Sequence, residues 1–402
     1  MAQPFLVVAS DLHLTPHAWA KHPTLRGDAY CSLQQIVDLA IAHAAPLILL
    51  GDIFDEGRPD SESVLFFYRQ MARMAEAGLA VDAIEGNHDG TRGVPWCRIH
   101  PWVRWVNRQS FQIGPFQCYG LDYHARGVLA TELAAVPPGT DVLFCHQAWS
   151  DVQGIGNTDG SFADIHHARY LFTGDYHTHR WYQGANAQGQ PLLAFSPGST
   201  CMQATDEDPY KHVYLLYEHP DHPREIMASS HMLVTRPFYQ RVLHTEEEFA
   251  AAMESLRPDP PPAVPGFEDI AKPLLRIKYQ DTIENAYNRI HETCGDRYHL
   301  FLDVIHGEVE ITPVHVPGQT ESPAGNFDTL ETGLYAMHAQ GAITEAEYNS
   351  AVRLLRSQNR TGEFNALFEE YYQSVRNQLQ AVPPGNLVGT GDGAGGVPQV
   401  SV

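Results

Sequence analysis

The sequence predicts an α/β layered fold that carries a polar site at one edge of a sheet. Short apolar runs alternate with segments of helical period through the first 90 residues, which is typical of strand–helix–strand units. Five apolar runs end on side chains with oxygen or nitrogen ligand atoms, at residues 11–13, 51–55, 86–89, 145–146 and 174–179. Because strand ends of an α/β sheet meet along one edge, these side chains are expected to converge.

The elements of the first 217 residues can be placed in order. Apolar runs predict strands over residues 4–10, 47–50, 79–84, 142–145, 170–173, 192–195 and 211–217. A first helix is predicted from the spacing of Leu33, Ile36, Val37, Ala40 and Ile41. A second helix, over residues 61–77, ends at Gly78. The glycine-rich residues 153–160 are expected to form a loop at the rim of the site.

The segment between Arg92 and Arg126 differs from the acidic remainder of the chain. It contains five arginines and three tryptophans but a single acid, Asp122. Basic residues interleaved with aromatics suit contact with a nucleic-acid backbone or a subunit interface. The alternative is an ordinary amphipathic helix with its tryptophans in the core.

The sequence changes in character after residue 232, which we take as the end of a first domain over residues 1–232. Residues 233–317 are expected to form a small α+β cap with strands at 238–243, 274–278 and 300–305, a capping box at Thr245 and Glu248, and a helix near 281–293. Residues 318–382 are expected to be helical, and their apolar stripe at 364–379 packs on its own protein or on a partner's helix. The glycine-rich residues 383–402 are expected to be disordered.

Composition limits the classes of function. The net charge of −22 over 402 residues argues against a protein that holds DNA by its surface charge alone. No apolar run reaches the ~20 residues that a membrane span requires, and the N-terminus has no signal-peptide pattern. The six cysteines are scattered without close pairs, which argues against a disulfide framework and favours a reducing compartment, the cytoplasm.

The residues at the strand ends form a ligand set for two metal ions. Asp11, His13, Asp52 and His179 are expected to bind one ion, and Asp52, Asn87, His146 and His177 the other, with Asp52 shared. Mixed oxygen and nitrogen ligands without cysteine suit Mn²⁺ first, with Fe²⁺ or Zn²⁺ as alternatives. Two ions about 4 Å apart can clamp a phosphate ester and stabilise its leaving oxygen.

His88 follows the ligand Asn87 directly and is the expected catalytic residue. It is free to donate a proton to a departing alkoxide. We expect Asp89 to orient it, as a carboxylate behind a metal ligand orients an imidazole.

The series Asp-x-His, Gly-Asp, Gly-Asn-His-Asp, His and His-x-His resembles that of the calcineurin-like metallophosphoesterases. Further stretches are similar to the DNA-repair branch, the SbcD-type nucleases that work with an SbcC-type ATPase. These stretches are Ser10-Asp11-Leu12-His13-Leu14, Arg26-Gly27-Asp28-Ala29, Gly51-Asp52-Ile53-Phe54-Asp55 with Arg58-Pro59, Tyr119-Gly120-Leu121-Asp122-Tyr123, Ser196-Pro197-Gly198-Ser199-Thr200 and Lys211-His212-Val213.

The resemblance implies a four-layer α/β/β/α sandwich with a cap and a C-terminal helical region. It implies Mn²⁺-dependent cleavage of DNA phosphodiesters, exonucleolytic and endonucleolytic, in repair, recombination or replication, with His88 as proton donor. It also implies a homodimer through helices near 61–77 and 94–107, a cap over 233–316 that helps select DNA, and docking of the 364–379 stripe on the coiled-coil base of an SbcC-type ATPase.

Two features depart from the family pattern. The last motif reads Gly-Asp-Tyr-His-Thr-His where the common form is Gly-His-x-His, and Asp55 stands where some members have a histidine. Two other functions stay open: a metallophosphoesterase acting on a small phosphodiester or phosphoprotein, and a scaffold without catalysis.

Overall fold

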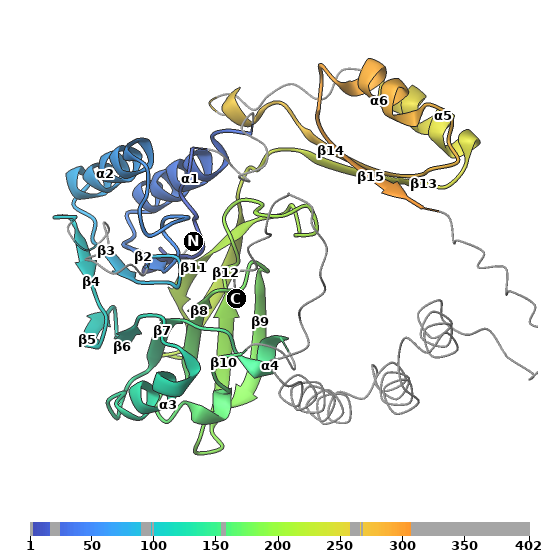
Figure 1. The fold of residues 1–402 in the computed structure, drawn as a ribbon. Helices are drawn as coiled ribbons and strands as arrows, with labels where there is room; N and C mark the ends of the chain where they lie inside the picture. The colour runs from blue at the N-terminus through green and yellow to red at the C-terminus, as the bar shows by residue number, and fades with distance from the viewer. Residues whose placement is uncertain are drawn as a thin grey trace, which may run out of the picture. The chain divides into compact units, whose positions relative to one another are not determined.

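Figure 1 shows a computed structural model of the chain, in which residues 3–16, 25–89, 98, 100–153, 158–257, 266 and 268–306 are described. The chain divides into two compact units between residues 310 and 311, and every described residue belongs to the first unit. The predicted helical region 318–382, with its stripe at 364–379, and the predicted tail 383–402 therefore lie outside the described residues.

The first sheet has six strands in the order β12-β11-β1-β2-β3-β4. Strands β1 to β4 run parallel, and β11 pairs antiparallel with both β1 and β12. The bounds are β1 Leu6–Ala9, β2 Leu47–Leu50, β3 Val81–Ile84, β4 Val103–Trp105, β11 His212–Glu218 and β12 Ile226–Met232.

The second sheet also has six strands, in the order β5-β6-β7-β8-β10-β9. Strands β6, β7, β8 and β10 run parallel, and the two edge strands pair antiparallel with their neighbours. The bounds are β5 Gln109–Ile113, β6 Phe116–Leu121, β7 Val142–His146, β8 Tyr170–Gly174, β9 Arg180–Ala185 and β10 Pro191–Ser196.

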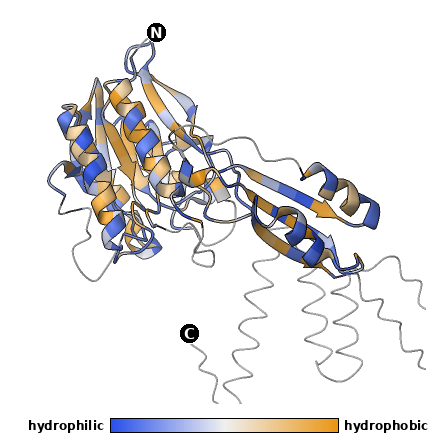
Figure 2. Cartoon of the chain, turned by 90° about the horizontal axis from the view of Figure 1, so that it is seen from above, coloured by the Kyte–Doolittle hydropathy of each residue, from blue (hydrophilic) through white to orange (hydrophobic). Residues whose placement is uncertain are grey.

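Three apolar cores divide this region into four layers, which confirms the predicted α/β/β/α sandwich. Alternate residues of β1 face opposite ways: Leu6 and Val8 lie in the core between the sheets, and Val7 and Ala9 pack against the helix layer of α1 (Asp28–Ala42) and α2 (Ser61–Glu76). The second sheet packs its outer face on α3 (Arg126–Ala134) and the short α4 (Ser150–Gln153). Figure 1 shows α1 and α2 beside the first sheet and α3 beside the second, and in Figure 2 the strands are mostly apolar while the outer faces of the helices are hydrophilic.

Residues 238–305 form a separate three-stranded sheet of β13 (Phe238–Leu243), β14 (Leu274–Gln280) and β15 (His299–Ile305), all parallel. Helices α5 (Glu246–Ser255) and α6 (Ala286–Cys294) pack on it around Phe249, Leu275 and Ile290. The predicted capping box is present at Thr245 and Glu248. This unit corresponds to the expected cap.

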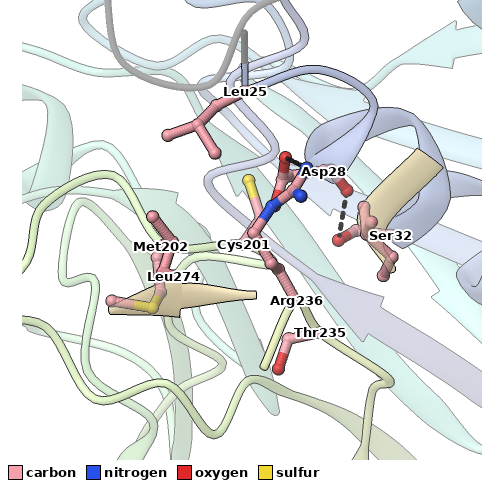
Figure 3. A pocket seen from close by; sticks show the side chains of 9 residues that line it. Leu25, Asp28, Ser32, Cys201, Met202, Thr235, Arg236 and Leu274 are labelled. Carbon is pink, nitrogen blue, oxygen red and sulfur yellow. Dashed lines mark hydrogen bonds and ion pairs between the residues drawn. The ribbon is translucent and has the colours of Figure 1, made fainter. Parts of the chain in front are cut away.

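A buried arginine joins the cap to the first sandwich layer. Arg236 donates to both carboxylate oxygens of Asp28 at the start of α1, at 2.9 and 2.7 Å, and to the carbonyl oxygens of Arg26 and Lys272. Figure 3 shows this arginine reaching Asp28 beside Ser32, in a small pocket that Leu25 and Leu274 also line.

One predicted element is wrong in its described part. Within the helix predicted near 94–107, residues 103–105 instead form β4, which pairs with β3. Arg104 on this strand donates two hydrogen bonds to Asp82 of β3, at 2.6 and 2.7 Å, so the arginine stabilises the pairing of β4 with β3.

Among the helices of the described ranges, none has the length and apolarity that a membrane crossing requires.

Candidate metal centre

The loops that follow the parallel strands carry most of the predicted ligands, and several have an unusual backbone. Asp11, His13 and Asp52 have positive φ angles of 50°, 45° and 49°, a left-handed conformation that residues other than glycine rarely adopt. The loops after β1 and β2 are hydrogen-bonded to each other, since the Asp11 N–H donates to Gly51 O and the His13 N–H to Asp52 O. Strained backbone of this kind persists where the surrounding fold holds it, commonly at functional sites.

Asp11, His13 and His177 form a first group of possible ligands. Their ligand atoms lie within 4.8 Å of one another. His177 Nε2 is 3.9 Å from Asp11 Oδ1 and 3.2 Å from His13 Nε2. His177 thus lies with Asp11 and His13, and not beside Asn87 and His146 as predicted from the sequence.

Asp52, Asn87 and His146 form a second group. His146 Nε2 lies 3.4 Å from Asp52 Oδ2 and 3.0 Å from Asn87 Oδ1. The same Asp52 oxygen is 3.7 Å from His13 Nε2 in the first group. Asp52 therefore stands between the two groups, as expected of a shared carboxylate.

The histidine hydrogen bonds leave one nitrogen of each ring facing these groups. His146 Nδ1–H donates to Leu50 O at 2.7 Å, and His177 Nδ1–H donates to Glu207 Oε1 at 2.7 Å. His13 Nδ1 lies 3.2 Å from Asp55 Oδ1. In the neutral rings, the Nε2 atoms then carry lone pairs. If His13 also carries its hydrogen on Nδ1, two Nε2 lone pairs lie 3.2 Å apart next to the fully buried Asp11 carboxylate, and a cation among them would remove their repulsion.

The electrostatics of the centre favour a cation as well. Burial alone raises the pKa of Asp52, but the imidazoles of His146 and His13 outweigh it and hold that pKa well below its usual value. Burial alone lowers the pKa of His146, but nearby carboxylates, Asp52 foremost, raise it. The donor set and its charge fit divalent metal ions bound by carboxylate, carboxamide and imidazole.

His88 is exposed at the edge of this cluster. Its backbone N–H donates to Asp52 Oδ1 at 2.9 Å, and its ring stands edge-on to His13 with centroids 4.9 Å apart. His88 Nδ1–H donates to the carbonyl oxygen of Asp55 at 2.8 Å, which leaves Nε2 available.

The structure contradicts the expectation that Asp89 orients His88. The buried Asp89 carboxylate instead accepts backbone N–H groups of Ile53, Phe54 and Gly86, and so joins two loops.

Sequence reasoning missed a second set of partners behind His177. The carboxylate of Glu207 that accepts from His177 also accepts from the buried Lys211 Nζ at 2.6 Å and from Ser199 Oγ at 3.2 Å. Lys211 and Ser199 stand in stretches quoted for the family resemblance, but Glu207 lies in a loop without any strand or helix pattern.

The last motif places its residues differently from the expectation. His179 donates from Nδ1 to Pro197 O at 3.1 Å, stacks on His212, and has its ring centroid 4.5 Å from that of Tyr214. Among the described residues it belongs to none of the groups whose ligand atoms lie within 4.8 Å. Asp175 is likewise in none of these groups of the described residues, but its Oδ1 lies 3.8 Å from His146 Nε2, and its backbone N–H donates to Asp11 Oδ1 at 3.1 Å.

Residues 6–187 match the family model described as calcineurin-like phosphoesterase. This range contains the strand ends and all the predicted ligands. Over these residues the chain is similar to the calcineurin-like phosphoesterases.

Individual relatives match shorter parts of the chain. It is 29% identical over 153 residues to an uncharacterized metallophosphoesterase, YhaO, of Bacillus subtilis, a match of 34% of this chain and 38% of the relative. It is 25% identical over 174 residues to the DNA double-strand break repair protein Mre11 of Sulfurisphaera tokodaii, covering 39% of this chain and 44% of the relative. The crystal structure of TT1561 from Thermus thermophilus aligns with 57% of this chain and 99% of its own, at 14% identity and a TM-score of 0.34. The chain thus matches less than half the length of these two curated relatives.

Proposed function

We propose that the protein is a two-metal phosphodiesterase that cleaves DNA, as exonuclease and endonuclease, in repair, recombination or replication. The observation that carries the proposal is the position of Asp52, whose Oδ2 lies 3.7 Å from His13 Nε2 on one side and 3.4 Å from His146 Nε2 on the other. A carboxylate between two sets of imidazole and oxygen ligands is what a shared ligand of two ions requires. Mn²⁺ is the ion proposed first, with Fe²⁺ or Zn²⁺ as alternatives.

Different residues of the chain would bind the ions and donate the proton in the proposed reaction. When bound, a pair of divalent ions supplies Lewis acidity and a nucleophile for attack on phosphorus. Asp11, His13 and His177 would hold one ion and Asn87 and His146 the other, with Asp52 between them. His88 would hand a proton from Nε2 to the leaving oxygen, because its Nδ1 is fixed by the Asp55 carbonyl and its ring is exposed toward solvent.

A polymeric substrate is supported by exposed side chains that follow His177 closely in the sequence. Strand β9 starts three residues after His177, with Arg180 and Trp181 exposed, and Trp181 shows 61% of its surface to solvent. An exposed tryptophan beside an arginine suits base stacking and backbone contact. One of the curated relatives is a DNA double-strand break repair protein, which favours DNA over a small phosphodiester.

We also propose a homodimer and an SbcC-type ATPase partner with a coiled coil, in the cytoplasm. The described part of the proposed dimer face has exposed apolar side chains on α2 and next to β4. Leu65, Tyr68 and Trp102 are 48%, 42% and 40% exposed, and the rings of Tyr68 and Trp102 lie 4.9 Å apart. Such a patch supports contact with a second copy. The net charge of −22 supports dependence on a partner for tight DNA binding.

End-labelled duplex and single-stranded DNA, incubated with the full chain and Mn²⁺ or Mg²⁺, test the proposal. We expect Mn²⁺-stimulated degradation that is weak for the protein alone and stronger with a candidate partner ATPase. Asp52→Asn and His88→Ala should each lower the rate at least 100-fold. His222→Ala, an exposed histidine on the β11–β12 turn, is the matched control and should keep the wild-type rate.

Turnover of bis-p-nitrophenyl phosphate with no action on DNA would replace the proposal with a small-molecule phosphodiesterase. Failure of the purified protein to bind divalent ions would favour a scaffold without catalysis.

A further inference from the structure

The environment of His146 Nε2 contains one more possible ligand atom than the sequence predicts. Three oxygens surround this nitrogen: Asn87 Oδ1 at 3.0 Å, Asp52 Oδ2 at 3.4 Å and Asp175 Oδ1 at 3.8 Å. Atoms bound at about 2.1 Å to one ion lie roughly 3–4 Å from each other. None of the three oxygens carries a hydrogen when the carboxylates are ionised, and the His146 side chain is fully buried. When the His146 ring is neutral, a cation bound among these four atoms satisfies all of them.

The backbone directs Asp175 into this set. Gly174 ends β8, and the next side chains alternate: Tyr176 is buried in the outer core, where its hydroxyl donates to Trp149 O at 2.7 Å. Asp175 and His177, on either side of Tyr176, face the other way, toward His146 and Asp11 respectively.

The conformation of Asp175 matches that of the other ligands. Its φ of 78° is positive, like those of Asp11, His13 and Asp52, so four of the eight described non-glycine residues with positive φ belong to this centre. Its N–H donates to Asp11 Oδ1, which ties the loop after β8 to the loop after β1. Among the described residues, no lysine or arginine forms an ion pair with Asp175. A carboxylate in a strained backbone conformation, with 22% of its side chain exposed and His146 as its neighbour in place of a lysine or arginine, indicates a ligand.

We propose that Asp175 is a ligand of the second ion, together with Asp52, Asn87 and His146, and that His179 is not a ligand of either ion. This inference rests on the proposed two-ion centre and deepens it.

The ligand sets of the two proposed ion positions then differ in chemistry. The first has two imidazoles and two carboxylates, whereas the second has one imidazole and three oxygen donors, two of them charged. Oxygen-rich sets suit Mn²⁺ and Mg²⁺, and imidazole-rich sets suit Zn²⁺. The second position should therefore select Mn²⁺ or Mg²⁺ over Zn²⁺ more strongly than the first.

Metal binding itself tests the inference, without reference to catalysis. The full chain is stripped with EDTA and titrated with Mn²⁺ by calorimetry, and the bound metal is counted by elemental analysis. Electron paramagnetic resonance then distinguishes a coupled Mn²⁺ pair from a single ion. We expect two ions in the wild type and a coupled spectrum. Asp175→Asn should weaken the second ion at least tenfold and abolish the coupled signal.

Two further variants complete the design. His179→Gln is the matched control from the same motif and should keep both ions and the coupled spectrum. Asp175→His should keep two ions but raise the affinity for Zn²⁺ relative to Mn²⁺ at least tenfold. Circular dichroism melts of the metal-free proteins confirm that each variant is folded. If Asp175→Asn does not fold, the Zn²⁺/Mn²⁺ ratio of Asp175→His decides the question.

The outcomes separate this inference from the proposed function. Two ions of wild-type affinity in Asp175→Asn, loss of an ion in His179→Gln, or an unchanged Zn²⁺/Mn²⁺ ratio in Asp175→His would overturn the ligand assignment and leave the nuclease proposal intact. If Asp175→Asn loses one ion and the wild-type protein does not cleave DNA, the ligand assignment is upheld and the nuclease proposal is refuted.

Discussion

Glu207 Oε1 accepts a hydrogen bond from His177 Nδ1 at 2.7 Å, and its other oxygen lies 2.6 Å from the buried Lys211 Nζ. Burial alone raises the pKa of Glu207, but the hydrogen bond to His177 and the charge of Lys211 outweigh it and lower that pKa to about 2. The carboxylate thus stays ionised behind the imidazole. Such a partner fixes the tautomer of a ligand histidine and makes its free nitrogen a better ligand.

Replacing Glu207 with glutamine should therefore weaken metal binding without removing a ligand. We expect Glu207→Gln to lower the Mn²⁺ affinity of the position that contains His177 by about 10–100-fold, measured by calorimetry on the full chain. Glu254→Gln, whose side chain is 72% exposed on α5, is the control and should bind like the wild type. An unchanged affinity in Glu207→Gln would show that the hydrogen bond plays no part in binding.

Gly86 lies so close to Asp52 that no side chain fits between them. A Cβ on Gly86 would stand 2.0 Å from Asp52 Oδ1 and 2.4 Å from the Asp52 backbone nitrogen. Gly86→Ala should displace the shared carboxylate, and we expect loss of the coupled Mn²⁺ pair in electron paramagnetic resonance. Gly127→Ala on α3, where the space is open, is the matched control and should keep the pair. A coupled pair in Gly86→Ala would mean that the loops shift without affecting the site.

The ion pair of Arg236 and Asp28 should contribute strongly to stability, because both side chains are almost fully buried. Removing one partner leaves the other charge buried and unpaired. Arg236→Met or Asp28→Asn should each lower the free energy of unfolding by about 3–5 kcal/mol in urea titrations. Arg257→Met removes an exposed pair with Glu254 and should cost less than about 1 kcal/mol. Equal small losses in all three variants would refute a special role for Arg236.

The thiol of Cys118, buried between the two sheets, predicts a loss of stability at alkaline pH. Burial raises its pKa from 9.0 to about 12. A group whose pKa is higher in the folded state contributes stability below its unfolded pKa, and this contribution is lost as pH rises from 9 through 12. Cys118→Val removes that titration. We expect its unfolding free energy to fall less steeply above pH 9, by up to about 1.4 kcal/mol per pH unit. Identical slopes from pH 8.5 to 10.5 in urea titrations would contradict this.

With the exception of β6, which is also buried but was not predicted, the central strands could be predicted because both of their faces are buried. The continuous apolar runs of β1, β2 and β7 arise from packing on the other sheet on one side and on helices on the other. Strands β5, β9 and β12 lie at the sheet edges, and most of their side chains are exposed. Their mixed composition carries no strand signal, and the same reason explains why β4 was mistaken for part of a helix.

The candidate centre was predicted in part for a similar reason. Asp11, Asp52 and His146 follow apolar runs directly, so their convergence could be inferred from the chain. Asp175, which we propose as a further ligand, was not predicted from the sequence because the neighbouring His177-Thr178-His179 matches the common ligand pattern more closely. The burial of Tyr176, which places Asp175 on the opposite side, could not be foreseen. Glu207 was missed because its role depends on a contact across 30 residues.

The pairing of β1 with β11 has a consequence for biosynthesis. Leu6 lies opposite Leu216, so β1 acquires its antiparallel neighbour only after some 200 further residues have been translated. Until then a nascent chain exposes an apolar edge that can pair with other chains. A fragment that stops at residue 187, although it spans the whole family match, should accordingly aggregate on expression, whereas one that extends past residue 232 should not.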